Sequence, residues 1–429
     1  MSTPSGTRES IGYAALIRGN RNYRNLWFGQ IISLLGDWFN LIASATLIAT
    51  LTESGLAVGS LFLVRMLAPF LVSPIAGVVA DRYDRKTVLI LADLGRAATA
   101  FCFLLVRDPS QVWLLYTLTA AQLGLSGFFF PTRNAILPDI VSARELGAAN
   151  ALSAATWSVM LSLGAALGGL VSGTWGIYPA FFIDGLTFLL SAVFIARIHT
   201  TVARQIDASG KTLGAALQQY LEGVRFLRNY PAILAISLHK SVLGLLSASS
   251  FEIIEVTITD RIFPIGEGGS VGLGLMFMMT GIGSGLGPLL ARRFTKDRVR
   301  LLSLAILAGY GMMVAGYLIV TPLYTFGATL LGILVRALGG GVVWVFSTQL
   351  LLQLVPGQIR GRIFASEYAF FTLMGAFGAI LVGSALDASI GLSILIATLA
   401  GLTLLPASLW ALWLSRTRTL TPITEESLE

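Results

Sequence analysis

The fold is indicated by a stretch that reads Gly77-Val-Val-Ala-Asp81-Arg82-Tyr-Asp-Arg85-Lys86. This stretch begins at the end of one long apolar run, 56–80, and leads into a second, 88–106. A helix needs about 20 apolar residues to cross a bilayer, and basic residues gather in the loops that stay in the cytoplasm. The stretch therefore predicts a short cytoplasmic loop between two membrane-spanning helices.

The same pattern recurs 210 residues further along, as Gly287-Pro-Leu-Leu-Ala291-Arg292-Arg293-Phe-Thr295-Lys296. It again follows a long apolar run. A second echo pairs Pro138, before one apolar run, with Pro356, before another. Two offsets that agree this closely indicate a duplicated unit. An even number of spans in each unit gives both units the same orientation, which is the parallel-repeat arrangement.

The composition agrees with a membrane protein. Of the 429 residues, 55% are hydrophobic and 12% are charged, whereas soluble domains have about 25% charged residues. This balance excludes a soluble enzyme, a nucleic-acid reader and a disordered chain. The apolar runs are too long and continuous for the alternating strands of an outer-membrane barrel.

We predict an all-α polytopic membrane protein with 12 transmembrane helices arranged as two six-helix bundles. The predicted spans are 25–52, 56–80, 88–106, 111–131, 146–172, 177–198, 231–258, 271–291, 299–320, 322–352, 364–387 and 390–414. The predicted parts are an N-terminal segment (1–24), a first bundle (25–198), a linker with an amphipathic helix (199–230), a second bundle (231–414) and a tail (415–429).

Basic residues predict the orientation. With these spans, 23 Lys and Arg residues fall on the side of the N-terminus, and only Arg107 and Arg261 fall on the other side. Both termini are therefore expected in the cytoplasm. The net charge of +7 then reflects topology rather than an acidic partner. A single cysteine and two histidines give no basis for a disulfide framework or a metal site.

The loop at 77–86 resembles the signature loop of the major facilitator superfamily, although Asp84 stands where the family has glycine. Within that superfamily the chain is similar to the efflux branch that includes macrolide and enterobactin-type exporters. The similarity extends to the opening Asn20-Arg-Asn-Tyr-Arg24-Asn-Leu-Trp27-Phe-Gly-Gln30. It also includes the glycines of 164–169, where Ala165 replaces the proline of the antiporter motif.

The resemblance implies a conformational latch. In the family this loop joins the cytoplasmic ends of the two halves in the outward-open state. The matching residues here are Gly77, Asp81, Arg82, Arg85 and Lys86. The aspartate would lie at a helix N-terminus of the other half, and the basic residues would engage carboxylates. The alternative is a basic loop that only sets topology.

One face of the first span is polar. Its residues are spaced by three and four, and they are Gln30, Ser33, Asp37, Asn40 and Ser44. A polar stripe facing lipid is costly, so it must face protein or a water-filled cavity. An ionisable group at this depth is a candidate for a functional role, and Asp37 is therefore the first candidate proton carrier. The alternative is a structural hydrogen bond to a neighbouring helix.

The seventh span is the repeat counterpart of the first and is also polar. Lys240 and Glu255 lie on one face, with Glu252 adjacent. An unpaired lysine inside a bilayer is expensive, so Lys240 needs a carboxylate partner or an anionic group on the substrate. Comparable cavity-facing residues, on the tenth and fifth spans, are Arg336, Trp344 and Trp157.

Other charged and titratable residues have structural explanations. Asp93 and Arg96 are three positions apart and can pair on one helix. Glu367 is expected near a helix end, as a partner for the basic loops. His239 is expected to be packed or hydrogen-bonded rather than to relay protons.

The function expected from these features is proton-coupled export of a small amphipathic or apolar compound, drug-like or siderophore-like, by alternating access. No phosphate-binding loop is present, so the proton gradient rather than ATP would drive an antiporter of this kind. Asp37 is the first choice for the proton, and Glu252 or Glu255 the second.

The protein is expected to be a monomer without cofactors, not an enzyme, in the bacterial inner membrane. It would interact with its substrate, protons and lipid, and not with nucleic acid. The alternatives are a lysophospholipid transporter or flippase and a non-transporting sensor or scaffold.

Overall fold

The protein is all-helical. A computed structural model describes residues 12–142, 144–199, 222–296 and 298–417. The first half contains α1 (Tyr13–Gly19), α2 (Arg21–Thr52), α3 (Gly55–Arg82), α4 (Arg85–Cys102), α5 (Val112–Ile140), α6 (Leu146–Thr174) and α7 (Ile177–Ala196). The second half contains α9 (Pro231–Leu246), α10 (Ser249–Arg261), α11 (Ser270–Thr295), α12 (Val299–Val320), α13 (Phe326–Leu354), α14 (Gly357–Asp387) and α15 (Leu392–Arg416).

The described residues form 12 helical segments long and apolar enough to cross a membrane, with α9 and α10 together making one of them. The predicted number of spans is therefore confirmed. Side chains that cap helix N-termini explain several of the starts. Asn20 accepts a hydrogen bond from the first turn of α2, and Asp84 does the same for α4. The residue that replaces the family glycine is thus a helix cap. Most of the predicted linker helix lies outside the described residues.

The largest errors in the predicted spans are two ends and one break. The fourth span was expected to stop at residue 131, but α5 continues through Pro131 and Pro138 to Ile140. Proline is tolerated inside such helices because neighbouring helices satisfy the freed backbone groups. The eleventh span was expected from residue 364, but α14 begins at Gly357. The seventh was expected to be one helix and is broken at Ser247 and Ala248.

The break between α9 and α10 has a visible physical basis. Ser247 and Ala248 have non-helical backbone angles, which frees carbonyl groups that lipid cannot satisfy. Side chains of the same half satisfy them instead. Tyr317 donates a hydrogen bond to the carbonyl of Leu246, and Arg336 donates one to the carbonyl of Ser247.

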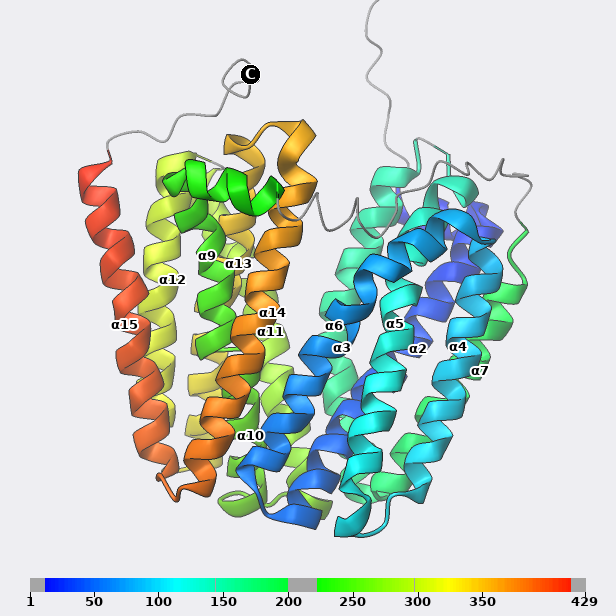
Figure 1. The fold of residues 1–429 in the computed structure, drawn as a ribbon, viewed down its shortest axis with the longest axis horizontal. Helices are drawn as coiled ribbons and strands as arrows, with labels where there is room; N and C mark the ends of the chain where they lie inside the picture. Colours follow the sequence, from blue (N-terminus) through cyan, green and yellow to red (C-terminus); the bar gives the residue numbers. More distant parts are fainter. Residues whose placement is uncertain (1–11, 143, 200–221, 297, 418–429) are drawn as a thin grey trace, which may run out of the picture.

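The two halves form separate bundles that meet along two helix pairs (Figure 1). Helix α3 packs against α14, and α6 packs against α11. Glycines allow the second pair to approach closely. A Cβ atom added to Gly169 would lie 2.5 Å from the carbonyl oxygen of Ser270 and 2.8 Å from the Cα of Gly274.

The halves are held together at one end of the molecule. We call the end that carries α1 and the last turn of α15 the terminal end, and the opposite end the far end. At the far end Asp387 of α14 accepts hydrogen bonds from Ser54 Oγ at 2.7 Å and from the backbone N–H of Gly55 at 2.6 Å. Arg261 donates to the carbonyl of Glu53 at 2.6 Å. Toward the terminal end the two bundles diverge (Figure 1).

Candidate functional site

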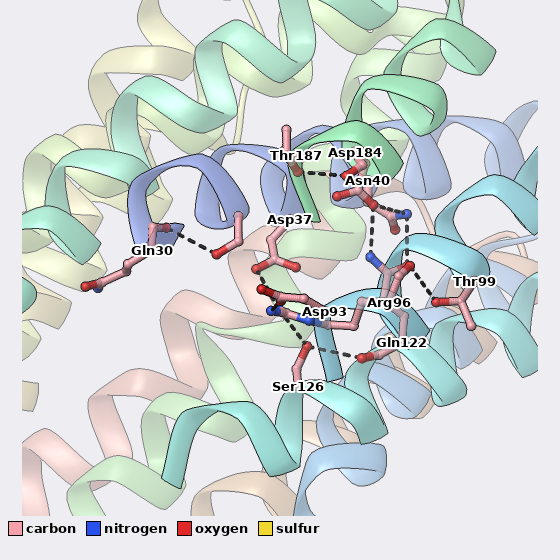
Figure 2. Close-up of polar contacts among 11 residues, drawn as sticks. Gln30, Asp37, Asn40, Asp93, Arg96, Thr99, Gln122, Ser126, Asp184 and Thr187 are labelled. Atoms are coloured by element: carbon pink, nitrogen blue, oxygen red, sulfur yellow. Dashed lines mark hydrogen bonds and ion pairs between the residues drawn. The ribbon is translucent and has the colours of Figure 1, made fainter. Parts of the chain in front are cut away.

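A buried guanidinium lies at the centre of the first half. Arg96 of α4 is 1% exposed and forms an ion pair with Asp93 on its own helix, which confirms that predicted pair. One Nη atom lies 3.9 Å from a carboxylate oxygen of Asp37 on α2 (Figure 2). The rings of Phe129 and Phe188 are each 4.3 Å from the guanidinium carbon. Aromatic faces and carboxylates together compensate the cation for its lost hydration.

The two carboxylates next to Arg96 differ in access. The side chain of Asp93 is completely buried, whereas that of Asp37 is 23% exposed. Asp37 also lines a small cavity, together with Asn40, Arg65, Thr119, Gln122 and Leu123. Asp37 is therefore the carboxylate of this pair that water and protons can reach.

A third carboxylate lies close by on α7. Asp184 is fully buried and accepts hydrogen bonds from the side-chain amides of Asn40 at 3.0 Å and Gln122 at 2.9 Å (Figure 2). The same two amides are joined to each other at 3.2 Å. This network connects α2, α5 and α7 at the wall of the Asp37 cavity, which Asn40 and Gln122 line. Asn40, predicted as a cavity residue, thus also has a structural hydrogen bond.

The two polar residues nearer the start of α2 make different contacts. Gln30 accepts a hydrogen bond from Arg133 of α5, and Ser33 donates one to the backbone of its own helix. Arg133 also donates to Ser153 Oγ of α6 at 2.7 Å. Arg133 was expected in a loop, and the structure corrects this. The apolar residues on both sides of Arg133 were the signal that the helix continues past Pro131. Trp157, one turn beyond Ser153, is 52% exposed.

Lys240 has a carboxylate partner in the second half. Its Nζ atom is 2.7 Å from Glu367 on α14 and 4.8 Å from the ring centre of Trp344 on α13. Of the two alternatives left open by the sequence, the structure therefore supplies the carboxylate. The prediction that Glu367 partners the loops from a helix end is wrong. Because α14 begins at Gly357, Glu367 lies well inside the helix and is 1% exposed.

A second ion pair lies nearer the far end. Glu255 of α10 is fully buried, 3.6 Å from Arg336 of α13. Arg336 also donates to Ser247 Oγ at 2.5 Å, and its guanidinium lies 4.1 Å from the centre of the Phe251 ring. Glu252 is half-buried and interacts electrostatically with both Arg336 and Arg65. Arg65 is on α3, so Glu252 connects charges of the two halves.

The predicted latch residues make contacts within the first half only, as far as the described atoms show. Arg85 pairs with Asp139 of α5 at 2.6 Å, and Lys86 donates to the carbonyl of Ile198 at 2.7 Å. Arg82 is exposed, and a Cβ atom added to Gly77 would meet nothing within 4 Å. The side chain of Asp81 lies outside the described atoms.

His239 is packed, as expected. Its Nδ1 atom is 2.8 Å from the hydroxyl of Tyr310, and its ring stands edge-on to Trp410 with centres 4.4 Å apart. Both neighbours are uncharged aromatic residues of the second half, on α12 and α15. His239 takes no part in the charged clusters described above.

Comparison with known proteins places this arrangement in a family. The sequence profile of the Major Facilitator Superfamily matches residues 26–379. The chain belongs to this superfamily. It is accordingly a multi-pass membrane transporter of the secondary type and not an enzyme.

Similar sequences come from bacteria. The uncharacterized MFS-type transporter YfiS of Bacillus subtilis is 31% identical over 220 residues, which is about half of each chain (51% and 52%). The putative bacilysin exporter BacE of Bacillus amyloliquefaciens is 23% identical over 89% of this chain and 93% of its own. The multidrug resistance protein MdtG of Salmonella paratyphi C is 27% identical over 81% of this chain and 83% of its own.

Solved structures show the same fold at low identity. The nucleoside transporter NupG has a TM-score of 0.70 and 13% identity, covering 91% of this chain and 98% of its own. A bacterial homologue of the human lysosomal transporter Spinster, in an inward-facing and occupied conformation, has a TM-score of 0.72 and 14% identity. That match covers 95% of this chain and 98% of the homologue. These likenesses confirm the major facilitator fold.

Proposed function

We propose that this transporter exports a small amphipathic or apolar compound in exchange for protons. The observation that carries the proposal is Asp37, a carboxylate beside the buried Arg96 that also lines a cavity. An ionisable residue inside a membrane marks a proton or substrate pathway by default. The names of two relatives, a multidrug resistance protein and a putative bacilysin exporter, support export. The resemblance to macrolide and enterobactin-type exporters supports a compound of similar chemistry.

The proposal includes an orientation in the bacterial inner membrane. Basic residues favour cytoplasmic termini, so the terminal end would face the cytoplasm and the far end the outside. The contacts of Asp387 and Arg261 then close the outer end. The structure would represent an inward-facing conformation, and the bonds of Arg85 and Lys86 within the first half fit a latch that acts in the opposite state.

Charge balance suggests how a proton acts. Asp37, Asp93 and Asp184 provide three negative charges, and Arg65 and Arg96 provide two positive ones. One proton would reduce the net negative charge of this group, which lowers the cost of keeping it away from water. The proton would enter Asp37 from outside and weaken its attraction to Arg96. Helix α2 would then move relative to α4, and the halves would reclose at the outer end.

The test has two stages. A susceptibility and accumulation panel of chemically diverse compounds, in cells with and without the gene, identifies a transported compound. Proteoliposomes then measure transport of that compound with and without a pH gradient. We expect Asp37→Asn to abolish the stimulation by the gradient, whereas Asp108→Asn, which removes an exposed carboxylate, leaves it intact.

Each other result has a defined meaning. Gradient-driven transport that survives in Asp37→Asn removes Asp37 from the proposed role and moves attention to Glu252 and Glu255. Transport that ignores the gradient in the unmodified protein favours gradient-independent movement of a lipid, such as a lysophospholipid. A complete lack of substrate-dependent flux favours a sensor or scaffold.

A further inference from the structure

Arg133 is a buried cation whose hydrogen-bond partners are all neutral. It lies in α5 and is 7% exposed. Its guanidinium donates to Gln30 Oε1, to Ser153 Oγ at 2.7 Å and to Asn134 Oδ1 at 3.4 Å. Its Nε atom has no hydrogen-bond partner. No carboxylate of the described residues lies within ion-pair distance of it.

The other buried cations differ from Arg133 because each of them has a carboxylate partner. Within the described chain, the remaining buried Lys and Arg side chains each have a carboxylate neighbour, and they are Arg96, Lys240 and Arg336. Removing a charge from water costs several kcal/mol unless a countercharge compensates it. Neutral acceptors compensate a guanidinium only in part. The charge of Arg133 is therefore only partly compensated by its protein neighbours.

The surroundings of Arg133 favour an anion with an aromatic or apolar body. Trp157 follows Ser153 by one turn of α6 and is 52% exposed. Phe130 precedes Asn134 by one turn of α5 and is 44% exposed. Residues four apart lie on the same face of a helix, so an exposed ring lies next to each of these two guanidinium partners.

We propose that Arg133 binds the anionic group of an amphipathic molecule, a carboxylate, sulfonate or phosphate, whose ring or apolar body rests on Trp157 and Phe130. The planar guanidinium can offer two parallel N–H donors to such a group. Gln30 and Ser153 are positioning residues that hold the guanidinium in place. The proposal rests on the transport function proposed above and specifies its substrate class. Lys240 is not an equivalent site because Glu367 already neutralises it.

The experiment uses three probes that share one ring system and differ in charge: naphthalene-2-sulfonate, 2-naphthol and 2-naphthyltrimethylammonium. Isothermal titration calorimetry on the purified full chain in dodecyl maltoside measures their affinities without any gradient. We expect the sulfonate to bind most tightly. Arg133→Gln should weaken its binding by about tenfold to a hundredfold, the range expected for hydrogen bonds to a charged group. Arg133→Lys should lie between, and Arg144→Gln, at an exposed arginine nearby, should bind like the unmodified protein.

Two results would overturn the proposal: unchanged sulfonate affinity in Arg133→Gln, or equally tight binding of the ammonium probe. If thermal unfolding shows that Arg133→Gln does not fold, Trp157→Leu decides instead. Its ring is half-exposed, so the change should be tolerated, and it should weaken sulfonate binding several-fold. Unchanged affinity in a folded Trp157→Leu protein would likewise reject the site.

Further measurements identify the source of the anion and distinguish the anion site from the proposed transport function. Competition by phosphatidylglycerol in mixed micelles, but not by phosphatidylcholine, supports the site with a lipid headgroup as its occupant. Sulfonate binding that neither lipid displaces supports it with a free solute. Because binding is measured without a gradient, a protein that binds the sulfonate through Arg133 but shows no flux disproves only the transport function. Gradient-driven export together with unchanged Arg133→Gln affinity disproves only the anion site.

Discussion

At the scale of single residues, burial and pairing decide what each charge does. Lys240 and Glu367 are 127 residues apart in the chain but 2.7 Å apart in the structure. The sequence could predict that Lys240 needs an anion, because an isolated cation is expensive at that depth. It could not predict which one, since the choice depends on how α9 and α14 pack. Arg133 was missed for a related reason, because two prolines suggested a helix end.

We predict that Lys240→Gln and Glu367→Gln each destabilise the protein by about 3–5 kcal/mol, because each leaves the other charge buried and uncompensated. The double variant should recover most of this loss. Thermal unfolding in detergent, followed by tryptophan fluorescence, compares the stabilities of the single and double variants. The matched control is Arg362→Gln, which breaks the more exposed pair with Glu222 at 3.0 Å and should change stability by about 1 kcal/mol or less. A double variant no more stable than the singles would contradict this account.

At the scale of helices, the clearest contact between the halves is a carboxylate at a helix N-terminus. Asp387 ends α14 and accepts hydrogen bonds from the first residues of α3 at Gly55 and Leu56, as well as from Ser54. The free N–H groups and the positive end of the α3 dipole stabilise a negative charge there. This contact joins residues more than 300 positions apart, so no local pattern could reveal it. The spans themselves could be predicted, because lipid requires long apolar helices wherever the chain crosses it.

We predict that Asp387→Asn shifts the protein away from the conformation closed at the far end. Loss of a negative charge at a helix N-terminus costs about 0.3–2 kcal/mol, so the ratio of the two conformations should change by about 2-fold to 30-fold. Spin labels at Trp175 and Tyr324, both exposed at the far end, measure this by pulsed electron resonance in a protein with Cys102 replaced by serine. The population of molecules with the longer distance between the two labels should increase.

Asp108→Asn is the control for this measurement. Asp108 is an exposed far-end carboxylate that accepts hydrogen bonds from its own loop. Its replacement should leave the distance distribution unchanged. If Asp387→Asn also leaves it unchanged, Asp387 does not hold the far end closed.

At the scale of the whole molecule, hydropathy and the internal repeat predicted the number of spans and the fold, and the pairing between the halves followed only from the structure. The main contacts between the two halves are those of α3 with α14 and of α6 with α11. The glycines at 164–169 allow a neighbouring helix to approach closely, but nothing in the sequence identifies that helix. The broken seventh span was missed because no proline or glycine lies at Ser247 and Ala248. Tertiary hydrogen bonds from Tyr317 and Arg336 accompany that break.

We predict that Gly169→Ala blocks transport while leaving the protein folded. An alanine inside a helix usually gains about 1 kcal/mol over glycine, but here its Cβ would lie 2.5 Å from the carbonyl oxygen of Ser270 in the other half. The far end could then no longer close fully. Gly285→Ala is the matched control, since nothing lies within 4 Å of its added Cβ. Flux in proteoliposomes and thermal unfolding separate the two effects, and normal flux in Gly169→Ala would contradict the packing argument.

The interruption between α9 and α10 has a consequence for motion. Helix α9 packs on α13 and α14 of its own half, whereas α10 also touches α2 and α3 of the other. Two residues therefore separate α9, whose main contacts are in its own half, from α10, which contacts both halves. The angle between α9 and α10 can change at Ser247 and Ala248 without bending either helix. The two parts of the seventh span can therefore move separately when the halves rock against each other.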